Sequence, residues 1–185
     1  MSLMLGNKYI VGAHTEGFFS VINLEEQTSE VVPNPFGDEI ENIWGVETVG
    51  MFESEIFYAP TTNGLYECQL NEEGQILYTT TSFFMGINVT NSVLINEDEL
   101  LVSLQTDDWN KLVILNLETQ QEKVIIEPEN AIYCLDICKV PQVEGTPPYF
   151  IMHTGKGLTL VNAEKGKTYD LAQNNQTNFN VCRSI

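Results

Sequence analysis

The side chains that could carry chemistry are few and widely spaced in this sequence. His14 and His153 are its two histidines, and each follows an expected strand at what reads as the same place in a repeat. An imidazole at such a place could act as a general base or as a ligand. A polar residue at the end of a strand more often satisfies backbone groups of the next loop, and we expect that role for both. Both remain candidates for contacting a partner.

Other patterns typical of active sites or metal sites are weak. Asp107-Asp108 could bind a cation, but the D-x-D-x-D-G loop of a calcium site does not follow, which favours a solvated turn. The fingerprints of a nucleophile elbow, a P-loop and a dinucleotide site are missing. Among 26 Asp and Glu residues, carboxylate pairs for acid–base work could be drawn from any turn and single out none. We therefore predict no catalytic residue, no metal and no cofactor.

Large apolar residues outside the expected strands are better functional candidates. Phe83-Phe84-Met85 stands in a connector whose counterparts are polar or rich in proline, so it could form an exposed patch for a partner. These residues could instead fill a space between sheets, a reading with more weight for Phe83 than for Phe84. Trp109 and Phe36 are two further candidate anchors, since aromatic residues are enriched at interfaces. Trp44 is expected in the core.

Charge and composition narrow the classes of partner. The formal net charge is −18 and the pI is near 4.2. Nucleic acid and anionic membrane surfaces are repelled by such a field, whereas a basic protein or peptide is attracted. No signal-peptide pattern and no run of roughly 18 apolar residues is visible. The four cysteines form no C-x-x-C pair and read as buried thiols, so we predict a cytoplasmic protein that binds neither nucleic acid nor membranes.

The elements that must position these candidates are short expected strands, whose pattern repeats four times along the sequence. Runs of Val, Ile and Leu between polar turn residues indicate strands rather than helices. The residues that end one loop of each copy are separated by 47, 46 and 47 positions; they are Gly17, Gly64, Asn110 and Gly157. Four strands in a period of roughly 40–50 residues are typical of a β-propeller. We predict an all-β propeller with four-stranded antiparallel blades at about 2–32, 41–79, 91–126 and 132–171.

The repeats resemble the WD-repeat family over nearly the whole chain. Residues 92–95 and 100–103 are similar to the first two strands of that family, and residues 113–119 are similar to its third strand and the following turn. Leu115-Asn116 stands where Trp-Asp is usual, and both the Gly-His and the Trp-Asp dipeptides are missing, so the repeats are degenerate. The resemblance implies a propeller that serves as an interaction platform.

Four blades leave the completion of the ring open. The tail at 179–185 resembles the first strand of a further blade and ends without a turn. The chain could be a fragment of a longer propeller, it could pair with another chain such as a second copy of itself, or it could close alone. We favour the fragment, because unpaired strand edges are normally avoided.

The strand order predicts two chemically different faces. One face carries the loops with the two histidines, the phenylalanines and Trp109, and the opposite face carries acidic turns. Loops concentrate functional residues. We therefore predict a non-enzymatic scaffold that binds a protein or peptide on the first face through Phe36, Phe83, Phe84, Trp109, His14 and His153. The alternative is an enzyme of hydrolase or lyase type with its site on the same face.

Overall fold

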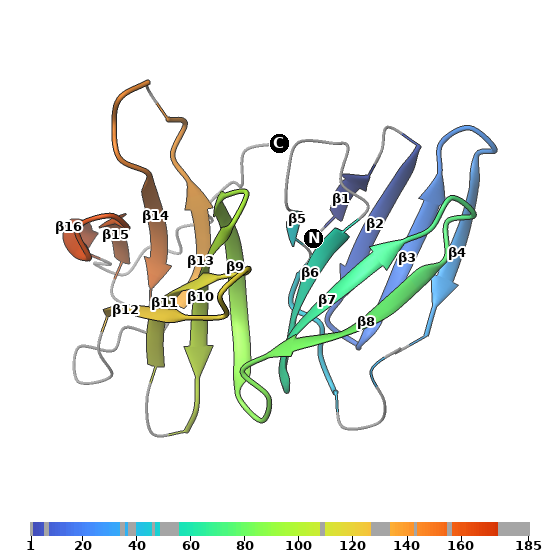
Figure 1. The fold of residues 1–185 in the computed structure, drawn as a ribbon, viewed down its shortest axis with the longest axis horizontal. Coiled ribbons are helices and arrows are strands. Elements are labelled where there is room, and N and C mark those ends of the chain that lie inside the picture. Colours follow the sequence, from blue (N-terminus) through green and yellow to red (C-terminus); the bar gives the residue numbers. More distant parts are fainter. Residues whose placement is uncertain are drawn as a thin grey trace. The chain divides into compact units, whose positions relative to one another are not determined.

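A computed structural model describes residues 2–5, 8–33, 36, 40–45, 47–48, 56–107, 110–126, 134–142, 144–154 and 157–173. Within these ranges the side chains at 2–5, 47–48, 80, 134–135 and 172–173 are not described. Every element in these ranges is a β-strand (Figure 1). The same ranges contain no helix that could cross a membrane.

The strands form four sheets, each with four strands in sequence order. The first sheet contains β1 (Ser2–Leu5), β2 (Tyr9–His14), β3 (Phe18–Asn23) and β4 (Thr28–Val32). The second contains β5 (Glu47–Thr48), β6 (Ile56–Thr61), β7 (Gly64–Leu70) and β8 (Ile76–Phe83). The third contains β9 (Asn88–Asn96), β10 (Glu99–Gln105), β11 (Asn110–Asn116) and β12 (Glu122–Ile126). The fourth contains β13 (Cys134–Lys139), β14 (Tyr149–Thr154), β15 (Gly157–Asn162) and β16 (Lys167–Gln173).

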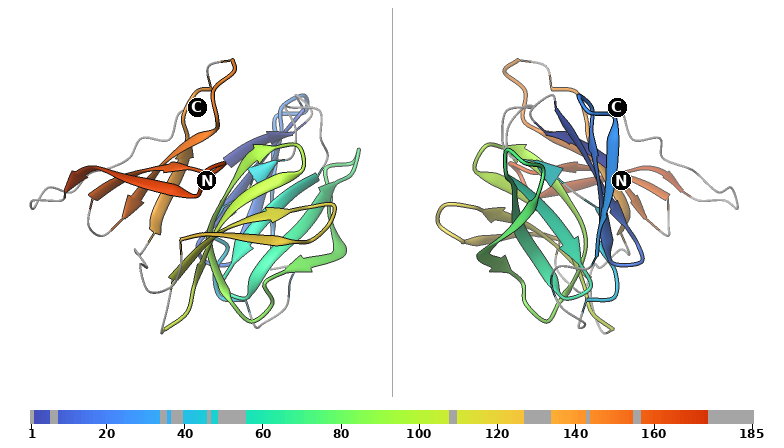
Figure 2. Two further views of the ribbon diagram at one scale, coloured as in Figure 1. Left: turned by 60° about the vertical axis from the view of Figure 1, so that its left-hand side comes forward. Right: turned by 90° about the vertical axis from the view of Figure 1, so that its right-hand side faces the viewer.

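Each sheet is an antiparallel meander, as predicted for a blade. Neighbouring strands pair in simple registers such as Val11 with Val21 in the first sheet and Ile151 with Leu160 in the fourth. Figure 2 shows the strands of each sheet side by side and twisted. The four sheets are named blades 1 to 4 below.

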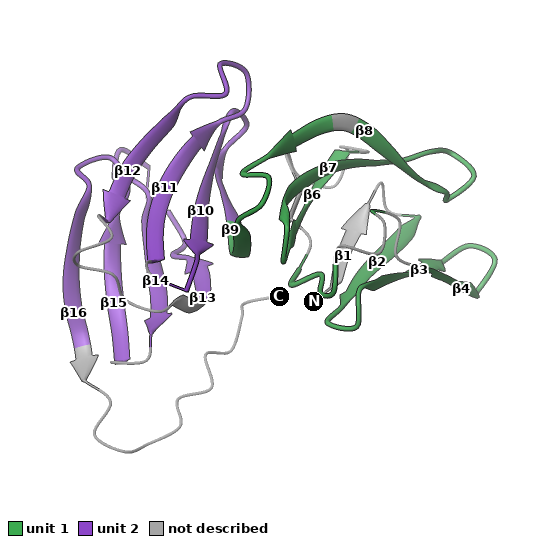
Figure 3. Ribbon diagram, turned by 90° about the horizontal axis from the view of Figure 1, so that it is seen from below, with its two compact units in different colours: residues 1–92 green, residues 93–185 purple. Residues whose placement is uncertain are grey.

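The chain divides into two compact units, Met1–Ser92 and Val93–Ile185 (Figure 3). Unit 1 holds blades 1 and 2, and unit 2 holds the larger part of blade 3 together with blade 4. Each unit is described by itself.

The core of unit 1 lies between its two blades. Alternate residues of β2 and β3 from blade 1 pack against alternate residues of β6 and β7 from blade 2; they include Val11, Ala13, Phe19 and Val21 on one side and Phe57, Ala59, Cys68 and Leu70 on the other. The ring of Phe19 meets the ring of Phe57 edge to face at 5.9 Å. Each fully buried large side chain of this kind stabilises the unit by about 1.5–3 kcal/mol.

The core of unit 2 is built in the same way. Residues of blade 3 pack against residues of blade 4; they include Leu101, Leu112 and Ile114 on one side and Phe150, Met152 and Val161 on the other. All six are at most 6% exposed. Burial of one sheet face against the next explains why the strands alternate apolar and polar residues.

An asparagine stabilises the turn between the third and fourth strands of every blade. The Oδ1 atom of Asn23 accepts hydrogen bonds from the backbone N–H groups of Glu25 and Glu26 at 3.0 and 3.1 Å. Asn71, Asn116 and Asn162 do the same for the N–H groups of Glu73, Thr119 and Lys165. Such side-chain acceptors replace backbone acceptors that a tight turn lacks.

Candidate functional site

The loops at one end of unit 1 form a connected surface, which we call the loop rim (residues 14–17, 40–44, 61–64 and 83–88). Within it the β6–β7 loop is fixed by Thr61. This buried hydroxyl donates to the carbonyl of Gly64 at 2.9 Å and accepts from the N–H of Asn63 at 3.1 Å. The loop is therefore an ordered platform.

The connector between β8 and β9 lies against this platform. The Oδ1 atom of Asn63 accepts a hydrogen bond from the N–H of Gly86 at 2.9 Å. A Cβ atom on Gly64 would lie 2.9 Å from the carbonyl oxygen of Phe83, so only glycine permits this approach. The connector closes its own turn through a hydrogen bond from the N–H of Ile87 to the carbonyl of Phe84 at 3.0 Å.

Two large apolar side chains stand on this connector. Met85 is 53% exposed, and Phe84 is partly exposed. The backbone of Phe84 has a φ of +57°, which L-residues other than glycine adopt at a cost of about 1–2 kcal/mol. A non-glycine residue in this conformation persists because its surroundings hold it there, and such outliers gather at functional sites.

The segment before β5 completes the loop rim. The hydroxyl of Thr62 accepts hydrogen bonds from the N–H groups of Glu41 and Asn42 at 3.1 and 3.4 Å. The indole N–H of Trp44 donates to Oδ1 of Asn88 at 2.8 Å. Trp44, which we expected in the core, is only partly buried. The structure thus adds Trp44 to the rim.

Two of the candidate anchors pack against other side chains of unit 1, an outcome that the sequence favoured for Phe83. Phe83 is the last residue of β8 and is 8% exposed. The Phe36 ring stacks on Tyr66 at 4.3 Å and meets Phe19 edge to face at 6.0 Å. Tyr66 is itself packed on the core of the unit, so Phe36 is a structural residue. Trp109 lies outside the described residues.

The two histidines occupy different places in the repeat. His14 ends β2 and pairs with Phe18, whereas His153 precedes Thr154, the last residue of β14. Side chains alternate along a strand, so this offset of one residue puts the histidines on opposite faces of their blades. The predicted equivalence is therefore wrong.

His14 lies beside a hydroxyl, an arrangement that catalysis could use. Its Nε2 is 3.1 Å from Oγ of Ser20, and its ring stacks on Phe18 at 4.2 Å. Ser20 lies in the middle of β3, paired with Gly12 on one side and Val31 on the other. Because β3 pairs with a strand on each side, the backbone N–H groups near Ser20 donate to those strands. They are therefore not available to donate to the oxyanion of a reaction intermediate. The pair fits a polar contact on a sheet face better than a nucleophile and its base.

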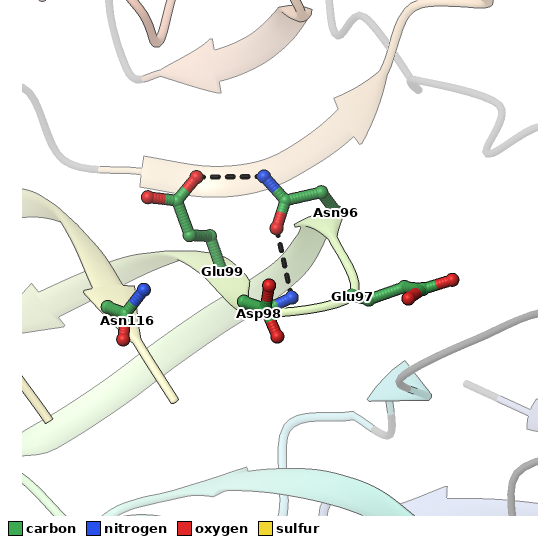
Figure 4. A pocket seen from close by; sticks show the side chains of 5 residues that line it. All are labelled: Asn96, Glu97, Asp98, Glu99 and Asn116. Carbon is green, nitrogen blue, oxygen red and sulfur yellow. Dashed lines mark hydrogen bonds between the residues drawn. The ribbon is translucent and has the colours of Figure 1, made fainter. Parts of the chain in front are cut away.

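Acidic residues gather in the turns of blade 3. An open depression of about 550 Å³ is lined by Asn96, Glu97, Asp98, Glu99 and Asn116. Figure 4 shows the Asn96 amide between the Glu99 carboxylate, at 2.8 Å, and the Asp98 backbone N–H, at 2.9 Å, while Glu97 points away. Among the described residues no three groups are arranged to hold a metal ion. The depression is a solvated acidic surface.

Two buried ionisable groups lie in blade 2; the burial of the Cys68 thiol was expected from the sequence, and that of Tyr58 was not. The Tyr58 hydroxyl donates to Oε2 of Glu67 at 2.8 Å, and burial, with a smaller effect of Glu67, raises the pKa of Tyr58. Burial likewise raises the pKa of the Cys68 thiol. Both groups are kept neutral, which suits a structural role.

Comparison with known proteins identifies the fold. No family model and no curated protein sequence matches the chain. Among 51 matching chains of solved structures is the dihydro-heme d1 dehydrogenase NirN in complex with DHE, a β-propeller-type protein, at a TM-score of 0.62 and 11% identity. The match covers 92% of this chain and 35% of the NirN chain, so this chain spans about a third of that length. The likeness shows that the four sheets are blades of a β-propeller.

Proposed function

We propose that this chain is a non-enzymatic binding module that captures a protein or peptide on the loop rim of unit 1. The observation that carries the proposal is the Phe84–Met85 pair. A flexible connector would fold such side chains onto the nearest apolar surface. Here Met85 is 53% exposed, while the turn around it is fixed by hydrogen bonds from Gly86 and Ile87. Rigid apolar anchors lose little entropy on binding.

The surroundings of this pair suggest the chemistry of the partner. Glu16 and Glu41 are the exposed charged residues in the described part of the rim, and both are acidic. Trp44 adds a flat surface on which a cationic or apolar side chain can lie. A segment with a large apolar side chain beside lysine or arginine fits this surface. Rim carboxylates would contribute more to the association rate than to affinity.

The alternative of an enzyme has less support from the same residues. Thr61 and Thr62 use their hydroxyl oxygens to hold backbone groups of the rim. The histidine–hydroxyl pair formed by His14 and Ser20 lies on a sheet face. The name of the structural neighbour describes a dehydrogenase. At 11% identity the similarity supports a shared fold and gives no support for a shared activity.

Site-specific photo-crosslinking tests the proposal. A photoreactive amino acid replaces Met85 in one variant and Leu77 in a matched control; Leu77 is 45% exposed on β8 of the same unit. Cells that express each variant are irradiated, and adducts are identified by mass spectrometry. We expect a discrete adduct at position 85 that position 77 does not give. The same adducts at both positions, or none at position 85, would refute the proposal.

A further inference from the structure

The two cores of the chain are built by one rule. We call the blade face turned toward the following blade of its unit the forward face, and the face turned toward the preceding blade the backward face. In unit 1 the forward face of blade 1 meets the backward face of blade 2. In unit 2 the forward face of blade 3 meets the backward face of blade 4. Equivalent cross-strand pairs make the backward faces, namely Phe57 with Cys68 and Phe150 with Val161.

Blade 1 also has a backward face. The pair that corresponds to those two is Ile10 with Ile22, since these residues alternate along β2 and β3 with Val11 and Val21, which face the core of unit 1. The equivalents in blades 2 and 4 are 0% exposed, whereas Ile22 is 37% exposed and the nearby Val31 is 63% exposed.

The composition of this face differs from that of the whole chain. Its cross-strand register places these residues together: Ile10, Gly12, His14, Phe18, Ser20, Ile22, Ser29 and Val31. None is a carboxylate, although the chain contains 26 Asp and Glu. An apolar surface free of acidic groups, on so acidic a protein, indicates a surface that another blade covers.

The forward face of blade 4 is the complement. The pairs Ile151–Leu160 and His153–Leu158 are equivalent to Val11–Val21 and Ala13–Phe19 of blade 1. Those blade 1 residues are at most 8% exposed. In blade 4 all four residues are only partly buried, and the adjoining Tyr169 is 48% exposed.

We propose that the forward face of blade 4 in one copy of this chain docks on the backward face of blade 1 in a second copy. The contact would repeat the forward-to-backward packing that forms both cores, and it would use the strand positions that face each other in the core of unit 1. It joins two different surfaces, so it is a heterologous interface, which forms rings or chains of copies. This inference is independent of the loop rim, because it uses sheet faces and no rim residue other than His14.

The histidines provide a position-specific test of this contact. In the unit 1 core the equivalents of His153 and His14 are Ala13 and Thr61, at the loop ends of β2 and β6. Docking by the same rule brings His153 of one copy toward His14 of the other. Two single variants, His14→Cys and His153→Cys, are made with the native cysteines replaced (Cys68→Ala, the others to Ser) and are mixed under mild oxidation. We expect a mixed disulfide dimer between the two variants.

A second measurement uses the solution mass of the full chain by light scattering. Wild type is expected to associate at micromolar concentrations, and Ile22→Glu is expected to weaken association at least about 100-fold, because docking would bury an unpaired carboxylate. Leu77→Glu, on β8, is the matched control and should leave the mass unchanged. A monomeric wild type, the absence of the mixed disulfide dimer, or an Ile22→Glu variant that associates like wild type would overturn the proposal.

Discussion

Two glycines of the loop rim allow the close packing of its connector to be measured. Gly64 has a φ of +126°, and an added Cβ would lie 2.9 Å from the carbonyl oxygen of Phe83 and 3.2 Å from Sδ of Met85. Gly86 has a φ of +80°, but an added Cβ there would meet nothing within 4 Å. Alanine has a backbone cost at both positions, larger at Gly64, whose φ lies farther from the left-handed helical region, and only Gly64 adds a close contact.

The expected losses of stability follow from this difference. Gly86→Ala should lower the free energy of unfolding by about 1 kcal/mol, the cost of positive φ for a residue with a Cβ. Gly64→Ala should lower it by about 2–4 kcal/mol, since the backbone cost is added to the displacement of the Phe83 carbonyl. Urea unfolding followed by circular dichroism measures both variants.

The contact with Met85 adds a functional readout. Gly64→Ala should also reduce crosslinking from position 85, because the connector must move away from the β6–β7 loop. Gly86→Ala should leave that crosslinking unchanged. Equal stabilities for the two variants, within about 0.5 kcal/mol, would refute the account of the rim as a platform that holds the connector.

Three further residues, Asn116, Phe36 and Cys68, allow tests of the fold of the blades. Asn116→Ala should cost about 1 kcal/mol through loss of its turn hydrogen bonds, and Asn116→Asp should restore most of it; equal losses would contradict the turn role. Phe36→Ala should cost about 2–4 kcal/mol by leaving a cavity beside Tyr66, and a loss below about 1 kcal/mol would make Phe36 a surface residue after all. Native Cys68 should resist alkylation near neutral pH, and partly buried Cys138 should react first; the reverse order by peptide mapping would contradict the burial of Cys68. Because the folded state raises the pKa of Cys68, its contribution to stability is present below about pH 8.5 and declines at higher pH, a decline that Cys68→Ala should reduce.

The repeat made the blades predictable from the sequence. Equal spacing of the loop-ending residues and the alternation of apolar residues depend on local geometry, which a sequence records directly. The turn asparagines were also visible, as Asn116 and Asn162 stood at matching places in the repeat. Their role as acceptors for turn N–H groups follows from short-range chemistry.

The candidate site was less predictable, because it depends on tertiary contacts and on strand ends. Phe83 was placed in a connector, but β8 continues through the Thr- and Ser-rich stretch at 79–82 and includes it. β-Branched threonine supports a strand, which this stretch could have indicated. Phe36 is partly buried and stacks on Tyr66, thirty residues away, and no local pattern shows that contact.

The histidines show how a small error in register changes a functional prediction. The loop after His14 has three residues, whereas that after Thr154 has two. Counting from the last strand residue rather than from the histidine would have placed His14 and His153 on opposite faces. In a strand, one residue decides which face a side chain joins.

The binding affinity of the partner captured at position 85 is the most direct test of the loop rim. Phe84→Asn removes the aromatic ring, while asparagine tolerates the left-handed backbone that Phe84 adopts. Burial of a phenylalanine contributes about 1.5–3 kcal/mol, so we predict a dissociation constant about 10- to 100-fold higher for Phe84→Asn, with an unchanged melting temperature. An affinity equal to that of wild type, or a loss of binding that only accompanies unfolding, would contradict the central claim that the loop rim binds a partner.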